Sequence, residues 1–269
     1  KLIKGDASFR KFYRKKNIKK SSIIVYSKKE KIINLLNYDS VNKILLKNKI
    51  LAPKIILENY NKNYIEIEDL GNQTLLDILK KKSVNKIKIY QKILIILKKI
   101  QNIKIKKIKN FKKKFYKIPT YSNSLLYQES SLFLKWYVPH VVNKKKLFKI
   151  NQKLKIIIKN LLKKIQLPNN KFVHRDFHVS NLMINNNQIS VIDSQDAVYG
   201  NIAYDLASLI DDVRFKTSNK IKKKIYSDYL SLNKKKINLI KFKNDFEILS
   251  VLRNLKIIGI FSRLSKRDN

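Results

Sequence analysis

Cysteine is absent from this 269-residue sequence, which excludes disulfide bonds and thiolate metal sites. This absence suits a reducing compartment, and we expect a cytoplasmic protein. Long apolar runs are missing as well. The longest, Ile93–Leu97 and Ile257–Phe261, are far shorter than the roughly 20 residues that a membrane-spanning helix needs. The start of the sequence shows no signal-peptide pattern, and we expect no membrane partner.

Acidic residues are also scarce, with 19 against 61 basic residues, which gives a formal net charge of +42. A surface of this sign can bind the phosphate backbone of nucleic acids through counterion release. However, only seven of the basic residues are Arg, the side chain that specific phosphate and base recognition favours. The excess of Lys, Ile and Asn is typical of an AT-rich genome. We therefore favour codon bias and expect no specific nucleic-acid partner, with a polyanion-binding surface as the alternative.

The first quarter of the chain is predicted to be mainly β-structure. Short strands are expected on either side of a tight turn at Gly5 and Asp6, and SSIIVYS (21–27) is a β-branched run that is typical of a strand. A helix is expected over Lys29–Asn48, with a break near Asn37. KIILENY and YIEIEDL, separated by residues 61–63, indicate a hairpin.

After Gly71 the pattern becomes helical. Thr74 is a candidate N-cap, and a longer helix is expected over Asn85–Asn102. Residues 104–117 are rich in Lys and are expected to form a solvated connector. The further segments expected to be helical are 125–137, which Pro139 would stop, 144–165, which Pro168 would stop, the region from Tyr204 onward, and 242–264.

Rare residues gather in one stretch, Phe172–Asp205. It holds two of the three His, four of the 19 acidic residues and the only Met. Within it, LMIN and SVID are expected to be two short strands that flank a turn at Asn185–Asn187. A composition as biased as this one makes such a concentration a strong indication of function.

The spacing of polar residues in this stretch is typical of a phosphoryl-transfer site. Asp176 and Asn181 lie in a loop that precedes a strand, and Asp193 ends the next strand. An Asn amide oxygen and a carboxylate are hard oxygen ligands that suit Mg²⁺, which completes its shell with phosphate and water. Asp176 is then the group expected to face a substrate hydroxyl.

The motif HRDFHVSN followed by VID resembles the catalytic loop and metal-binding aspartate of the protein-kinase-like superfamily. GDASFRKFYR, IEDLG, FLKWYV, HRDFHVSNLM, VIDSQDAVYG and AYDLASL together resemble the aminoglycoside-phosphotransferase-type small-molecule kinases. Within that family the motifs are most similar to those of the bacterial amino-sugar kinases of peptidoglycan recycling. The resemblance runs from Gly5 to about Asp268, and six motifs in the expected order make it specific.

The resemblance implies an α+β, protein-kinase-like two-lobed fold. Residues 1–70 would form a small antiparallel-sheet lobe that binds nucleotide, and residues 71–269 a mainly helical catalytic and substrate lobe. Asp176 would act as the catalytic base, and Asn181 and Asp193 would hold Mg²⁺ against the phosphates of ATP. The hinge would run from Glu68 to Leu70, and its backbone would meet adenine.

Other polar residues of the central stretch have supporting roles under the same resemblance. Asp205 would accept backbone N–H groups under the catalytic loop, and His174 would dock that loop. His178 could either contact the substrate or form a buried hydrogen bond, and the sequence favours neither role. Asp196 could hold its loop or help to bind the metal, and we favour the loop role.

The chain departs from the family pattern in three places. The phosphate-covering turn is GDAS, so Gly5 would supply the turn and Ser8 would meet phosphate. The strand SSIIVYS lacks the internal Lys of protein kinases, and Arg10 and Arg14 are the candidate replacements, unless both only pair with carboxylates. Ser194 stands where the family usually has Phe, which puts the packing of that segment in question.

Substrate residues are less well specified. Trp136 could stack on a sugar ring or belong to the core, Glu129 could bind hydroxyls or join a network, and Arg253 could meet a substrate anion. The leading hypothesis is an ATP- and Mg²⁺-dependent, monomeric kinase for the anomeric hydroxyl of N-acetylmuramate or N-acetylglucosamine. The alternatives are a kinase for choline, an aminoglycoside or homoserine, and an inactive kinase-like or polyanion-binding protein.

The sequence does not begin with Met and stops soon after the apolar run Ile257–Phe261. This is compatible with truncation at both ends and with the loss of part of the acceptor pocket.

Overall fold

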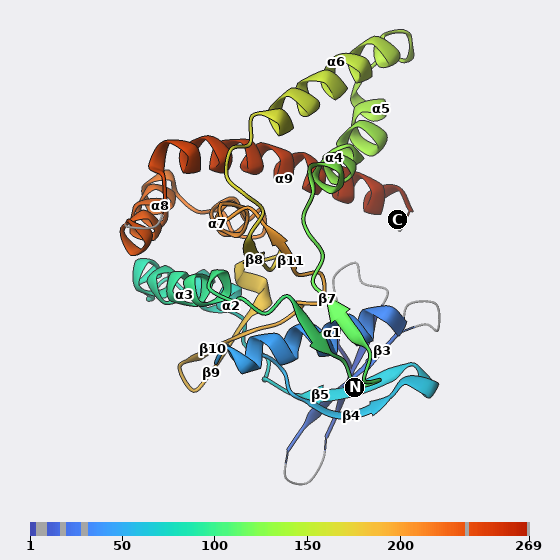
Figure 1. Ribbon diagram of the computed structural model, residues 1–269, viewed down its shortest axis with the longest axis vertical. Helices are drawn as coiled ribbons and strands as arrows, with labels where there is room; N and C mark the ends of the chain where they lie inside the picture. The colour runs from blue at the N-terminus through green and yellow to red at the C-terminus, as the bar shows by residue number, and fades with distance from the viewer. Residues whose placement is uncertain (4–9, 17–19, 28–31, 235–236, 268–269) are drawn as a thin grey trace. The chain divides into compact units, whose positions relative to one another are not determined.

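The computed structural model describes residues 1–3, 10–16, 20–27, 32–234 and 237–267 (Figure 1). The predicted turn residues Gly5 and Ser8 lie outside these ranges. The chain divides into two compact units. The first comprises residues 1–119 and 174–198, and the second comprises residues 120–173 and 199–269. The predicted lobe boundary at residue 70 stays a prediction.

The first unit contains a five-stranded sheet in the order β1-β2-β3-β5-β4. Its strands are β1 (Leu2–Ile3), β2 (Lys11–Lys15), β3 (Ser22–Tyr26), β4 (Ile55–Asn59) and β5 (Tyr64–Glu68), and all neighbours are antiparallel. Side chains alternate between the two faces of a strand. Ile23 and Val25 of β3 lie opposite Ile67 and Ile65 of β5, which gives the sheet one apolar face. The predicted hairpin is confirmed, and a 3-10 turn, η2 (Tyr60–Lys62), joins its strands.

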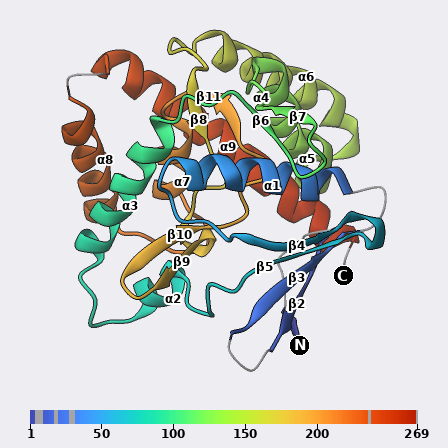
Figure 2. The same ribbon diagram turned by 60° about the horizontal axis from the view of Figure 1, so that its bottom comes forward.

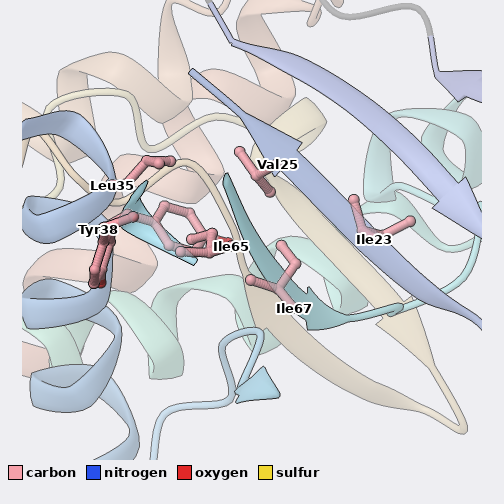
Figure 3. Close-up of a cluster of buried hydrophobic side chains, with 7 residues drawn as sticks. Ile23, Val25, Leu35, Tyr38, Ile65 and Ile67 are labelled. Carbon is pink, nitrogen blue, oxygen red and sulfur yellow. The ribbon is translucent and has the colours of Figure 1, made fainter. Parts of the chain in front are cut away.

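Helix α1 (Ile32–Lys47) packs on that apolar face. Figure 3 shows Leu35 and Tyr38 of the helix against Ile65 of the sheet. The predicted break near Asn37 is wrong, because α1 is continuous. The buried residues Leu35, Tyr38 and Val41 follow helical spacing, and their packing outweighs the loss of about 0.6 kcal/mol that Asn causes relative to Ala in a helix.

Helices α2 (Leu75–Lys80) and α3 (Lys86–Gln101) follow the sheet. The predicted N-cap is confirmed: the Thr74 side chain accepts from the Asp77 N–H, and the Asp77 carboxylate accepts from the Thr74 N–H, which together form a capping box. Asn85 caps α3 with a single hydrogen bond, in which its side chain accepts from the Lys88 N–H. Helices therefore begin where the sequence placed their caps.

The lysine-rich segment after α3 is not a plain solvated loop. It forms a hairpin of β6 (Lys107–Lys109) and β7 (Phe115–Lys117). The hairpin is held to α1 because the Asp39 carboxylate accepts from the Phe111 N–H at 2.7 Å, and Lys43 lies 4.1 Å from the Phe111 ring centroid. Burial raises the pKa of Asp39. Contacts of Phe111 with Asp39 and Lys43 of α1 therefore fix a segment whose composition suggests a solvated loop.

The central stretch contributes a further hairpin to the first unit (Figure 2). A 3-10 turn, η4 (Val179–Asn181), leads into β9 (Leu182–Asn185), which pairs with β10 (Gln188–Val191) as predicted. Asn186 and Asn187 both have positive φ, which a tight two-residue hairpin turn requires. The hairpin is fastened to the rest of the unit because the Val191 N–H donates to the Leu51 carbonyl and the Ile184 N–H to the Gln73 carbonyl.

The second unit is mainly helical, with a two-stranded sheet of β8 (Lys171–Val173) and β11 (Val198–Gly200). Its helices are α4 (Asn123–Ser130), α5 (Val138–Val141), α6 (Lys144–Lys163), α7 (Tyr204–Ile210), α8 (Asn219–Asn233) and α9 (Leu239–Arg267), with a π-helical turn η3 (Phe133–Tyr137) before α5. We predicted that Pro139 would stop a helix, and this prediction is wrong. Pro139 lies in the first turn of α5, where a missing N–H costs no intrahelical hydrogen bond.

Helix α9 packs closely against η3 at Gly259. A Cβ added at this position would overlap the backbone of Leu132 and Phe133. Glycine is therefore required here by the close approach of two backbones.

None of the helices among the described residues is long and apolar enough to cross a membrane.

Candidate active site

The predicted catalytic loop, residues 174–181, folds back on itself. The Asn181 Nδ2 donates to the Asp176 carbonyl at 3.0 Å, and the Asn181 N–H donates to the His178 carbonyl at 2.9 Å. Arg175, between His174 and Asp176, adopts a left-handed φ of 74°. The Asp176 side chain is half-buried, whereas its neighbour Phe177 is fully buried. The loop thus anchors an apolar residue next to Asp176, which is only half-buried.

The two His residues of the loop are buried and hold its shape. Burial lowers the pKa of His174, so its ring is neutral at pH 7. Its Nε2 lies 3.0 Å from the Ile192 carbonyl, and because a carbonyl only accepts, Nε2 carries the proton. The Nε2 of His178 lies 3.3 Å from the Asn181 Nδ2. This position supports the buried-hydrogen-bond role for His178, and substrate contact stays a prediction.

Asp193 follows β10 after one residue and has a left-handed φ of 61°. This conformation is rare for a residue other than Gly and is found often at functional sites. Its Oδ1 accepts from Nη2 of Arg10 at 2.5 Å and from Nε2 of Gln195 at 3.2 Å. The side chain of Asp193 is 37% exposed, and that of Arg10 is 8% exposed. One of the two arginines proposed from the sequence is therefore at the predicted metal ligand.

Gln195 holds this pair together. Its amide oxygen accepts from Nη1 of Arg10 at 2.8 Å, and its amide nitrogen donates to the carboxylates of Asp193 and Asp196. Sequence reasoning missed Gln195. Its only signal is its place two residues after Asp193, and an uncharged amide in a loop does not distinguish itself from a solvated side chain.

Ser194 replaces an apolar contact with a hydrogen bond. The fully buried Ser194 hydroxyl donates to the Asn42 Oδ1 of α1 at 2.7 Å, and the Asn42 Nδ2 donates to the Pro53 carbonyl at 3.0 Å. The segment after Asp193 is therefore packed against α1 despite the absent Phe. Next to it, burial raises the pKa of Tyr38 to about 12, and the charges of Arg10 and Asp193 act on this pKa in opposite directions.

Asn181 and Asp193 have the chemistry of magnesium ligands. The amide nitrogen of Asn181 is used within its loop, which leaves its oxygen for another partner. Asp193 offers a partly exposed carboxylate. Among the described residues no group of three or more His, Cys, Asp or Glu side chains forms a metal site. Mg²⁺ uses few protein groups when phosphates supply the other ligands, so its binding by Asn181 and Asp193 stays a prediction.

The hinge predicted at Glu68–Leu70 follows β5 directly. Glu68 ends the strand, its N–H donates to the Lys54 carbonyl at 2.8 Å, and Leu70 is half-buried. Asp69 between them forms an ion pair with Arg14, in which Nε lies 2.6 Å from Oδ2. Arg14 also donates to the Gly71 carbonyl at 2.9 Å. The second candidate arginine therefore fastens β2 to the hinge instead of reaching Asp193.

A cavity of about 420 Å³ lies beside this hinge. Its lining residues are Arg14, Lys16, Lys20, Ser21, Asp69, Gly71 and Asn72. Burial by itself raises the pKa of Asp69, but hydrogen bonds from Ser21, the Gly71 N–H and Arg14 outweigh it and lower that pKa below its usual value. Asp69 is thus an anion at pH 7 with both oxygens occupied.

Three of the predicted substrate residues, Glu129, Trp136 and Arg253, belong to the second unit together with Asp205, whereas His178 belongs to the first. Glu129 accepts from the Tyr121 hydroxyl and lies 3.2 Å from the Lys256 Nζ, so it is part of a network. Trp136 lies half-buried in η3. Arg253 is buried in α9 and donates to the Asp211 carbonyl at 3.4 Å, and Asp205 is fully buried in the first turn of α7. Contact of Glu129, Trp136 or Arg253 with a substrate stays a prediction.

Comparison with known proteins identifies the family. The model of the phosphotransferase enzyme family matches residues 1–231. The chain belongs to this family. The enzyme class predicted from the sequence, a phosphotransferase, is therefore confirmed, as is the family resemblance.

Two relatives are similar over nearly the whole chain. An N-acetylmuramate/N-acetylglucosamine kinase from Neisseria meningitidis is 26% identical, with 98% of this chain and 78% of the relative covered. A protein of the same name from Pseudomonas aeruginosa is 25% identical, with 98% and 76% covered.

The solved structures extend the comparison to the fold. A Plasmodium vivax ethanolamine kinase has a TM-score of 0.67 at 14% identity and covers 99% of this chain and 82% of its own. A spectinomycin phosphotransferase in complex with ADP and spectinomycin has a TM-score of 0.64 at 17% identity, with 100% and 84% covered. At such identities the likeness shows the fold alone, and it confirms the predicted α+β, protein-kinase-like class.

Proposed function

We propose that this phosphotransferase moves the γ-phosphoryl group of ATP to the anomeric hydroxyl of N-acetylmuramate or N-acetylglucosamine. The observation that carries the proposal is the similarity over 98% of the chain to two kinases that are named for these sugars. The loop and hairpin that present Asp176, Asn181 and Asp193 within one unit support it.

Asp176 is assigned to the acceptor. The residue is only half-buried, as a general base that meets an acceptor must be, and the Asn181 side chain donates to its backbone carbonyl. A base in this position orients the sugar hydroxyl and accepts its proton as the bond to phosphorus forms.

Asn181 and Asp193 are assigned to Mg²⁺, and Glu68–Leu70 to the adenine. The bound ion would neutralise charge on the transferring phosphoryl group. His174, whose ring donates to the Ile192 carbonyl, holds the catalytic loop to the residue that precedes Asp193. The neutral, buried His174 side chain thereby fixes the loop of the assigned base, Asp176, relative to the assigned metal ligand, Asp193.

A panel assay tests the acceptor. The full chain is incubated with labelled ATP, Mg²⁺ and, separately, N-acetylmuramate, N-acetylglucosamine, choline, ethanolamine, homoserine and an aminoglycoside. We expect transfer to the two amino sugars, and phosphorus NMR should show the phosphate coupled to the anomeric proton. An N-acetylglucosamine methyl glycoside, whose anomeric oxygen is blocked, is the matched control and should accept nothing. Transfer to choline, or to the blocked sugar, would overturn the proposed acceptor.

A further inference from the structure

The nearly buried Arg10 binds the carboxylate of Asp193, which is also the predicted metal ligand. Nη2 of Arg10 lies 2.5 Å from Oδ1 of Asp193, and only 8% of the Arg10 side chain is exposed. A guanidinium with so little contact with water depends on the carboxylate for its stability. Mg²⁺ at Asp193 would compete for the same negative charge and would repel the guanidinium.

The position of Arg10 suits it to a second anion. It precedes β2 by one residue, and its neighbour Lys11 lies opposite Tyr26 at the end of β3. The described part of that strand, Ser22–Tyr26, carries no basic residue. Alternation along β2 places Arg10 on the same face as Phe12, which packs on the core cluster of the sheet. The Arg10 guanidinium therefore extends from this face of the sheet to Asp193.

The geometry of the guanidinium matches two acceptors at once. Nη1 and Nη2 donate to Gln195 and Asp193 respectively, so the fork is already spread over two oxygens. A phosphate presents two oxygens in a similar arrangement and binds Arg in the same bidentate manner. Gln195 can keep its contact with Arg10 while the carboxylate partner is exchanged for phosphate.

We propose that Arg10 couples metal binding to nucleotide binding, by an exchange in which the phosphates take Arg10 from Asp193 and leave the carboxylate to the metal. Without a nucleotide, Arg10 competes with the metal and keeps its affinity low. With a nucleotide, the guanidinium binds phosphate and stabilises both ligands. The inference rests on the metal role assigned to Asp193 in the proposed function, but it requires no sugar.

Direct binding of Mn²⁺, followed by electron paramagnetic resonance with and without ADP, tests this coupling. In the wild-type chain ADP should raise the Mn²⁺ affinity by about tenfold or more, within the usual range of coupling between sites. In Arg10→Gln the affinity for Mn²⁺ alone should rise about fivefold or more while the affinity for ADP falls, so the coupling shrinks. Asp193→Asn, added to Arg10→Gln, should abolish the gain.

Lys11→Gln is the matched control, because it removes the same charge one residue away from an exposed position. It should leave the Mn²⁺ and ADP affinities as they are. If Arg10→Gln does not fold, Arg10→Lys replaces it: a single ammonium group cannot span both acceptors, so an intermediate gain in Mn²⁺ affinity is expected. Unchanged or weaker binding of Mn²⁺ alone by the Arg10 variant would overturn the proposal. Because no sugar is present, this result is distinguishable from a failure of the proposed acceptor.

Discussion

Ser194→Ala should destabilise the first unit measurably. The Ser194 hydroxyl and the Asn42 amide are both buried, with 0% and 1% exposure, and the hydroxyl donates to the Asn42 Oδ1 at 2.7 Å. Removal of the donor leaves that oxygen buried and without its hydrogen bond, which costs about 1–3 kcal/mol. For a protein of this size a loss of about 2 kcal/mol lowers the Tm by roughly 4–8 °C.

Thermal and urea unfolding of Ser194→Ala, Asn42→Leu and the double variant would measure this cost. Because the two side chains form one hydrogen bond, the double variant should be less destabilised than the sum of the single ones, by about 1 kcal/mol. Ser231→Ala is the matched control, since it removes an exposed hydroxyl on α8 that donates to the Ser227 carbonyl, and it should stay within about 0.5 kcal/mol of the wild type. A Ser194→Ala variant as stable as Ser231→Ala would refute the reasoning.

Three further outcomes are expected. Burial lowers the pKa of His174 in the folded state, so as the pH falls the unfolded chain protonates this ring before the folded chain does. The free energy of unfolding should therefore fall as the pH drops below about 6.5, by at most about 1.4 kcal/mol per pH unit from this group. Urea titrations at pH 7.5 and 5.5 should show a smaller fall for His174→Gln, and equal falls would contradict the assignment. Arg14→Lys keeps the charge but loses the paired contact with Asp69, so it should cost about 1–2 kcal/mol and weaken ADP binding in calorimetry; unchanged ADP affinity would remove Arg14 from the nucleotide site. Gly259→Ala should cost about 3 kcal/mol or more in thermal unfolding because its Cβ meets backbone, whereas Ser265→Ala on an exposed turn of the same helix should be neutral, and equal stability of the two would refute the close approach.

The parts of the fold that local rules govern could be predicted from the sequence. The β-branched run SSIIVYS, the hairpin that contains YIEIEDL, the turn predicted at Asn185–Asn187 and the cap at Thr74 all involve residues close in the chain. Their outcome depends on backbone preference and periodicity, which a single sequence displays.

The wrong predictions concern segments whose structure depends on contacts with residues far away in the sequence. α1 stays continuous at Asn37 because residues around it pack on the sheet, and the lysine-rich segment becomes a hairpin because Asp39, 72 residues before Phe111, binds its turn. The helical region predicted from Tyr204 onward had no stated end, and it divides into α7 and α8. Contacts between distant residues leave no mark in local composition.

The candidate site was predicted in part for the same reason. Asp176, Asn181 and Asp193 form a spaced motif with distinct chemistry and could be named from the sequence. The partners of Arg10 and Arg14 could not be told apart, because Asp193 is 183 residues from Arg10 and Asp69 is 55 residues from Arg14. Gln195 and Asn42, which hold the site, carry no charge, and the family resemblance assigns a role to neither.

Phosphoryl transfer by Asp176→Asn tests the central claim most directly. The substitution keeps the shape of the side chain but removes its ability to accept a proton, so kcat for N-acetylmuramate should fall by about 10²- to 10⁴-fold. The affinity for ADP, measured by calorimetry on the same preparation, should stay within about twofold of the wild type, because the base contacts the acceptor and not the nucleotide. Asp228→Asn on α8 serves as the control and should keep full activity. Wild-type turnover by Asp176→Asn, or an equal loss of ADP affinity and turnover, would contradict the account.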